Sequence, residues 1–228
     1  MDQKDWHDDV VLTERSAALA PRQRRQAAAL ALWRLRAPLF ELAMDAEWGI
    51  DLSVLESLFQ SAASAPGEQS NHRYRQAIVE LCDAPLFTSE VDPEARELVQ
   101  LETIARLLIF GEELEEAGPD KIEYIIDCPR GLADYLDGKV EDSFYSHPSQ
   151  DDHRQYLATL AGPIRSYGLG YLASRNLTIE YACHDAVQSL PPTEGLLDTC
   201  AGRDLIALCE DFSGELVAML RWLNTTGY

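Results

Sequence analysis

The chain has 228 residues, of which 39 are Asp or Glu and 19 are Lys or Arg, so its formal net charge is −20 with neutral histidines. Hydrophobic residues make up 46% and charged residues 25%, which is close to globular usage and excludes intrinsic disorder and collagen-like structure. A chain of this length can bury roughly 70% of its unfolded surface, so its core needs no disulfide or metal.

The sequence predicts a cytoplasmic protein without a membrane span. Its longest stretch free of Asp, Glu, Lys and Arg runs from Ser57 to Gly67, shorter than the roughly 17 apolar residues that a spanning helix requires. The amino terminus lacks the basic start and apolar middle of a secretory signal. The cysteines are odd in number, widely spaced and next to aliphatic residues, so we interpret them as free, buried thiols: Cys82, Cys128, Cys183, Cys200 and Cys209.

Helical periodicity begins at Pro21, a favourable first residue of a helix. One apolar face follows, made of Ala28, Leu32, Leu35, Leu39 and Leu42. Pro38 should kink or break this helix, which should end near Gly49. Arg22, Arg25 and Arg36 are expected to be solvated or paired with acids elsewhere.

The next two helices are bounded by turn signals. Asp51 should cap a helix that ends at Pro66-Gly67, and a third helix is predicted over 72–82. Asp92-Pro93-Glu94 combines a capping carboxylate, a proline and an acid at a helix start, and predicts a long helix to about Ala117. Its apolar pattern covers most of the circumference, so we expect it to be the central helix, with Gln100 and Thr103 on its outer side.

Further helices are predicted in the second half. One should run from Gly118-Pro119 to Gly138, bent by Pro129 and antiparallel to its predecessor. Residues 139–149 are expected to form a functional loop or a boundary. Helices should follow from Ser149 through Leu160, over 177–190 and over 203–223. Because no strand pattern stands out, the sequence predicts an all-α, compact bundle-like domain of roughly eight helices spanning 1–228, with any subdivision near 139–149 and a flexible segment 1–14.

The charge is distributed unevenly along the chain. Residues 15–36 contain six arginines and no acid, whereas 80–142 contain 18 acids and five basic residues, a charge of −13. A field of that sign repels nucleic-acid phosphates and would attract a basic protein. We therefore expect a protein-binding module that neutralises or escorts a basic partner, by analogy with acidic immunity proteins that bind toxins. The first partner-binding candidates are four acids at a helix end where the dipole disfavours them: Glu112, Glu113, Glu115 and Glu116.

The alternative is a metal-dependent hydrolase. Histidines and carboxylates are suitable ligands for divalent metals, and the candidate ligands are His147, Asp151, His153, His184 and Asp185. The His184-Asp185 dipeptide resembles that of all-helical metal phosphohydrolases, a resemblance that implies roles for His153, His184 and Asp185. Histidines converging in one cleft would favour this reading. The protein-binding interpretation needs no catalytic residue and no cofactor; oligomeric state is not encoded in any pattern.

Overall fold

The computed structural model of the protein describes residues 7–88, 90, 93–146, 150–166, 168–191 and 193–226. These residues are mostly helical, and the predicted all-α fold is confirmed. One short antiparallel hairpin, Arg165–Ser166 with Leu169–Gly170, interrupts the helices. The helices are α1 (Asp9–Ala17), α2 (Pro21–Trp33), α3 (Ala37–Glu41), α4 (Leu52–Ala63), α5 (Glu68–Cys82), α6 (Ala95–Glu112), α7 (Pro119–Ser146), α8 (Gln150–Leu157), α9 (Tyr171–Val187) and α10 (Cys200–Thr226), with 3₁₀ segments η1 (Ala46–Trp48), η2 (Pro85–Thr88) and η3 (Leu196–Asp198).

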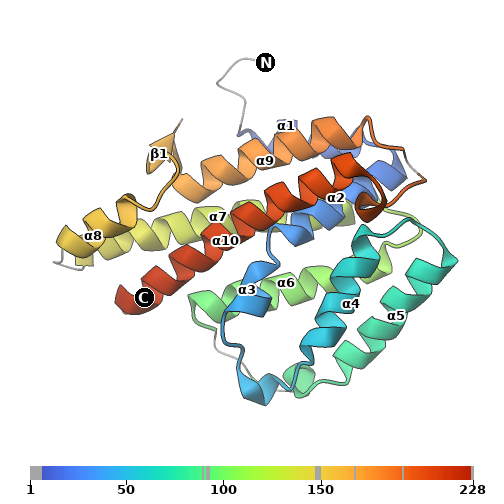
Figure 1. Ribbon diagram of the computed structural model, residues 1–228, viewed down its shortest axis with the longest axis horizontal. Coiled ribbons are helices and arrows are strands. Elements are labelled where there is room, and N and C mark those ends of the chain that lie inside the picture. Colours follow the sequence, from blue (N-terminus) through green and yellow to red (C-terminus); the bar gives the residue numbers. More distant parts are fainter. Residues whose placement is uncertain are drawn as a thin grey trace.

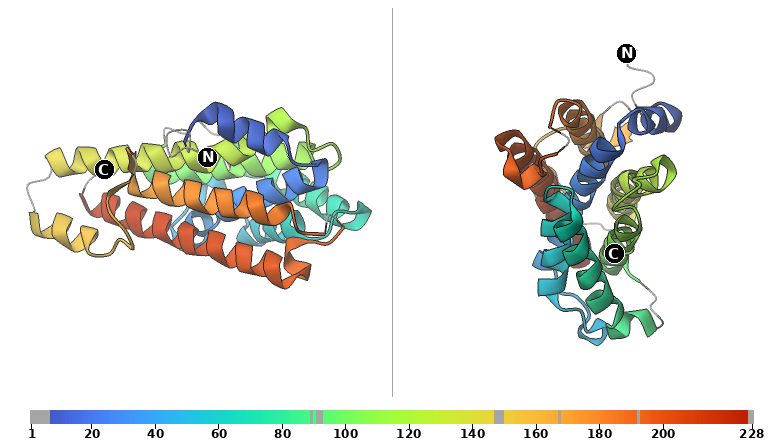
Figure 2. Two further views of the ribbon diagram at one scale, coloured as in Figure 1. Left: turned by 90° about the horizontal axis from the view of Figure 1, so that it is seen from above. Right: turned by 90° about the vertical axis from the view of Figure 1, so that its right-hand side faces the viewer.

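Three long helices, α7, α9 and α10, run side by side and give the molecule its long axis (Figure 1 and the left view of Figure 2). Helix α2 packs against all three of them and also against α4 and α6. Helices α4 and α5 form a hairpin at one side (Figure 1). A single contiguous core runs through the described residues, with members from Leu19 to Leu223. The single-domain organisation over 1–228 stays a prediction.

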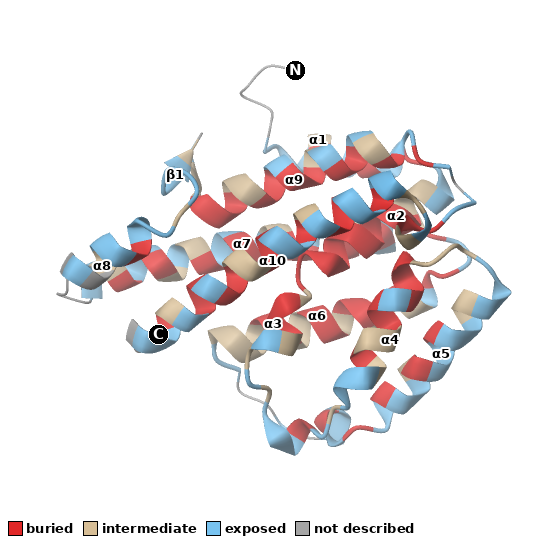
Figure 3. Ribbon diagram, in the orientation of Figure 1, coloured by how far each residue is buried: buried red, intermediate tan, exposed pale blue. Residues whose placement is uncertain are grey.

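The central helix is α2, and the prediction that the helix after Pro93 is central is wrong. Every residue of α2 from Arg25 to Trp33 is buried, and Figure 3 colours such residues red where α2 is visible behind α10. Four of these nine residues are alanines, whose small side chains favour the helix and let neighbouring helices approach closely. Because Ala carries little hydrophobic area, this run did not stand out as a central helix in the sequence.

Helix α6 is buried on a different face from the one predicted. Gln100 and Thr103 are fully buried, whereas Leu101 and Leu108 are only partly buried. The Gln100 side chain donates to the carbonyl oxygen of Pro38 at 2.9 Å, and the Thr103 hydroxyl donates to the carbonyl oxygen of Val99 at 2.7 Å. One hydrogen bond to another helix and one within α6 therefore allow these two polar residues to face the core.

Several turn signals acted as predicted. The chain breaks between α2 and α3 close to Pro38, and Gly49 follows η1 with a positive φ of 61°. The Asp51 carboxylate caps α4 by accepting from the Ser53 amide at 2.8 Å. Asp92 and Ser149, which were predicted to cap helices, lie outside the described residues. Glu94 occupies the position directly before α6.

The largest boundary error concerns residues 139–149. Helix α7 continues through Gly138 to Ser146, so 139–146 is helix rather than loop, and 147–149 lie outside the described residues. Val140 and Ser143 are buried on its inner side, and this packing extends the helix beyond its glycine. At the amino terminus, α1 begins at Asp9 and buries Leu12. Residues 1–6 lie outside the described part of the chain, and the flexibility of 1–14 stays a prediction.

None of the described helices has the length and low charge needed to cross a membrane. All five cysteines are free thiols. The prediction that all are buried is wrong for Cys82, the last residue of α5, and for Cys200, the first residue of α10, since both are exposed at helix ends.

Candidate functional site

Two adjoining pockets lie along one side of α7. The larger, of about 430 Å³, lies between α7, α8, the hairpin and the start of α9, and we call it the hairpin pocket. The smaller, of about 280 Å³, lies between α7, α1 and α9, and we call it the α1 pocket. Asp134 lines both, so the two pockets adjoin at this residue, and we call them together the α7 groove.

Acids and glycines share the side of α7 that lines the groove. Four acids occur there at helical spacing: Asp127, Asp134, Asp137 and Glu141. Gly131 and Gly138 lie between them, and a Cβ atom at either position would meet no atom within 4 Å. The groove is therefore open down to the backbone of α7 at two points, with carboxylates beside each.

Asp137 ties the groove to the start of α9. Its carboxylate accepts hydrogen bonds from the backbone amides of Leu172 at 3.0 Å and Ala173 at 2.8 Å, in the favourable position at a helix amino terminus. Burial nevertheless raises the pKa of Asp137 to about 6, because it outweighs these two bonds. A Cβ atom at Gly170 would lie 2.3 Å from Asp137, so only glycine allows this contact.

Aromatic and aliphatic side chains complete the lining of the hairpin pocket. They include Phe144, Tyr156 and Ile164. The Tyr156 side chain stacks on Trp222 with ring centroids 4.4 Å apart and is only 5% exposed. Its hydroxyl is buried and has no hydrogen-bond partner among the described residues. Burial, and next to it the charge of Asp137, raises the pKa of Tyr156, so the hydroxyl stays protonated.

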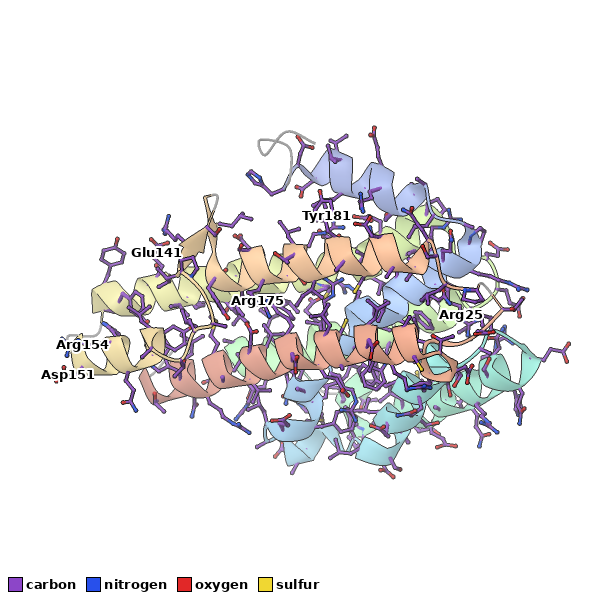
Figure 4. All side chains as sticks on the ribbon, turned by 45° about the horizontal axis from the view of Figure 1, so that its top comes forward. Arg25, Glu141, Asp151, Arg154, Arg175 and Tyr181 are labelled. Carbon is purple, nitrogen blue, oxygen red and sulfur yellow. The ribbon has the colours of Figure 1, made fainter. Side chains whose placement is uncertain are left out.

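The cations of the groove are already paired within the chain. Arg165 of the hairpin forms an exposed ion pair with Glu141, and Figure 4 labels Glu141. Arg130 forms ion pairs with Glu123 and Glu180. Asp134 is exposed and makes no ion pair with any described residue. The acids that line the groove thus outnumber its cations, and the surplus faces solvent.

A buried ion cluster lies behind the α1 pocket and connects α2, α7 and α9. Glu180 is 1% exposed and accepts from Arg130 Nη2 at 2.6 Å and from Arg34 Nη1 at 3.4 Å. Arg34 also donates to Asn176 Oδ1 at 2.6 Å. Burial alone would raise the pKa of Glu180, but the hydrogen bonds of Arg130 and the charge of Arg34 lower it, so Glu180 is ionised.

His184, one turn after Glu180, is held neutral in the core. It is 1% exposed, and neither ring nitrogen has a partner among the described residues. Burial lowers its pKa to about 4, and the charge of Glu180 opposes this only in part. Its neighbour Asp185 points to the surface instead and forms an ion pair with Arg15.

The predicted metal ligands that the structure describes have different surroundings. His153 of α8 packs edge-on against Phe144 with ring centroids 4.4 Å apart, whereas the charges that act on His184 of α9 are those of Glu180 and nearby arginines. Asp151 is exposed and pairs with Arg154 at the tip of α8 (Figure 4), and His147 lies outside the described residues. Within the described chain, no three His, Cys, Asp or Glu side chains are grouped so as to hold a metal ion.

The four predicted partner-binding glutamates have different surroundings. Glu113 is buried; its Oε2 accepts from the Gly118 amide at 2.7 Å, just before α7, and its Oε1 lies 3.3 Å from Lys121. Its negative charge therefore favours the amino terminus of α7 rather than only opposing the dipole of α6. The other three are exposed: Glu112 pairs with Lys121, Glu115 pairs with Arg75, and Glu116 makes no ion pair with described residues.

Tyr156, Asp137 and the buried ion cluster were not predicted from the sequence. A usable signal was available for Arg34, because an arginine inside a long apolar helical run requires an acid on another apolar stretch, and Glu180 lies in one. No local pattern marks Tyr156, since its environment comes from α7, the hairpin and α10. No protein-family model, curated protein or solved structure matches the chain.

Proposed function

We propose that the protein is a binding module for a basic protein partner and that the α7 groove is the surface that engages it. The observation that carries the proposal is the surplus of carboxylates in a concave, partly apolar surface whose arginines are already neutralised. Such a surface attracts cationic side chains and repels phosphates. The protein would neutralise or escort this partner, in the way that immunity proteins bind toxins. A cytoplasmic location fits the proposal as well, because the cysteines are free thiols.

The structure changes which acids should be tested first. Glu113 is occupied by Gly118 and Lys121, so it cannot contact a partner without breaking the turn before α7. Asp134 and Glu141 are exposed, lie in the groove and belong to the same acidic segment, 80–142. We therefore place the contact at the α7 groove, and the turn acids become the control.

Two double variants with the same change of net charge test the proposal. Asp134→Asn/Glu141→Gln removes two charges from the groove, and Glu112→Gln/Glu116→Gln removes two charges from the α6–α7 turn. Partners are captured from native cytosol on the immobilised full chain at low and high salt. We expect the native chain to retain basic proteins in a salt-sensitive manner, since screening acts over about 8 Å at physiological ionic strength. The groove variant should lose them and the turn variant should not.

Equal losses in both variants would show that overall acidity, rather than the groove, recruits the partner. Retention of only neutral or acidic proteins would reject the function itself. Circular dichroism and the unfolding midpoint of each variant, compared with the native chain, establish that the fold is intact.

A further inference from the structure

We infer that the hairpin pocket holds an arginine side chain of the basic partner, with its guanidinium between the α7 acids and the Tyr156 hydroxyl. The inference rests on the proposed function and names the chemical anchor within it. It depends on three independent features of the pocket: a tyrosine hydroxyl that no described residue pairs, the apolar lining, and the resident arginine at the rim.

The first feature is the buried polar atom. Tyr156 lines the pocket and is only 5% exposed. Its hydroxyl lacks a hydrogen-bond partner among the described residues. A buried, unpaired hydroxyl costs free energy, and a ligand that donates a hydrogen bond to its oxygen removes that cost. Asp137 lines the same pocket, and its charge contributes to the raised pKa of Tyr156. A donor placed there would therefore face both a neutral acceptor and a carboxylate.

The second feature is the combination of flat rings and carboxylates. A guanidinium stacks on aromatic faces and donates in a planar fork, whereas an ammonium is a compact, strongly hydrated charge. Phe144 and Tyr156 provide aromatic surface, while Asp134 and Glu141 provide carboxylates at the opening. The chain itself uses this geometry elsewhere, since the Arg106 guanidinium lies 3.9 Å from the ring centroid of Tyr124 and 2.9 Å from Glu102.

The third feature is Arg165. It lines the pocket and pairs with Glu141, and both side chains are largely exposed. This pair shows that a guanidinium fits at the rim, and an exposed pair of this kind contributes little to stability. An incoming arginine would compete with Arg165 for Glu141. Removal of Arg165 should thus strengthen binding of a guanidinium, an effect that a purely structural role of Arg165 would not produce.

The probe is a short acetylated and amidated peptide, Leu-Leu-Arg-Leu-Gly, compared with the same peptide carrying citrulline, the neutral isostere, in place of arginine. Each is titrated into the isotopically labelled full chain, and binding is followed from amide chemical shifts. We expect the arginine peptide to shift amides of 134–144, 156 and 164–172 and to bind at least tenfold more tightly than the citrulline peptide.

Four variants sharpen the assignment. Tyr156→Phe removes only the hydroxyl and should weaken the arginine peptide at least threefold, and Asp134→Asn/Glu141→Gln should weaken it more. Arg165→Gln should tighten it several-fold. Glu112→Gln/Glu116→Gln, the charge-matched control, should leave it unchanged. Equal affinity for the two peptides, shifts outside the hairpin pocket, or weaker binding by Arg165→Gln would overturn the anchor.

The two proposals fail separately. If partner capture depends on the groove acids but the peptides bind equally, the proposed function stands and the arginine anchor is rejected. If the arginine peptide behaves as expected but the groove variant still captures basic proteins, the pocket stands as an arginine site and the proposed partner interface is rejected.

Discussion

Arg130 of α7 and Glu180 of α9 form a forked ion pair inside the protein. Arg130 Nη2 lies 2.6 Å from Glu180 Oε1, and Arg130 Nε lies 3.0 Å from Glu180 Oε2. Two parallel donors on one carboxylate make a strong and directional contact. Since Arg34, which directly follows α2, contacts the same carboxylate, a single acid links three helices and holds Arg130, which lines the α1 pocket.

Removal of the Glu180 charge should destabilise the protein strongly. In Glu180→Gln, Arg34 remains buried with only Asn176 as a partner, and breaking a buried pair from one side costs about 3 to 5 kcal/mol. Urea unfolding at neutral pH measures the change. Glu215→Gln, which breaks the partly exposed pair with Arg175, is the control and should cost no more than about 1 kcal/mol. Equal losses would show that the buried cluster has no special role.

Stability should fall in acid because of His184. Its pKa is about 4 in the folded chain and 6.5 in the unfolded chain, so the unfolded state binds the proton first. The stabilisation from the neutral ring is complete above pH 6.5 and is lost as the pH falls toward 4, which amounts to roughly 2 kcal/mol between pH 7 and pH 4.5. His184→Gln should lack this component. Between pH 7 and pH 4.5, the unfolding free energy of the native chain should fall by about 2 kcal/mol more than that of His184→Gln. An equal fall in both proteins would contradict the assignment.

The turn before α7 should depend on one of the four glutamates. Glu113→Ala leaves the Gly118 amide without its acceptor and should cost about 1 to 3 kcal/mol, the range for a lost hydrogen bond to a charged group. Glu116→Ala, on the same turn but exposed, should change the unfolding free energy by less than about 0.5 kcal/mol. Chemical denaturation of the two variants checks this. A larger effect of Glu116→Ala than of Glu113→Ala would show that the structural role does not belong to Glu113.

Two glycines of α10 should respond in opposite directions to alanine. A Cβ atom at Gly202 would lie 2.2 Å from the carbonyl oxygen of Leu196, whereas one at Gly214 would meet no atom within 4 Å. Gly202→Ala should therefore destabilise by about 1 to 3 kcal/mol through overpacking. Gly214→Ala should stabilise by about 0.5 to 1 kcal/mol through helix propensity. Thermal unfolding of both variants gives the two signs, and a shared sign would contradict this packing.

The sequence predicted helices well where a local cap or proline marks their ends. Asp51 and Pro21 are examples, because capping and proline geometry act within one turn of the chain. It failed where packing extends an element, as at Gly138, and where burial depends on neighbours, as in the alanine-rich α2. The local preference of a glycine or an alanine is the same whether the helix continues or ends and whether the residue is buried or exposed. Tertiary contacts therefore decide where the helix ends and which residues are buried.

The candidate site was predictable only in part. The acidity of 80–142 pointed to the segment that contains α7, but charge counting could not separate the buried Glu113 from the exposed Asp134. The histidines attracted attention because of their chemistry, yet His184 is enclosed by α9 and its neighbours and His153 packs against Phe144. The Tyr156 hydroxyl carries no sequence signal, since its lack of a partner among the described residues is a property of the folded surroundings.

The sequence separation within the ion cluster has a consequence for folding kinetics. Arg34 and Glu180 are 146 residues apart, and Arg130 and Glu180 are 50 residues apart. Contacts between such distant positions close large loops, so they form only after α2, α7 and α9 have docked. Interactions that form after the folding transition state act mainly on the unfolding rate. The cluster should thus lengthen the lifetime of the folded chain while leaving its refolding rate almost unchanged.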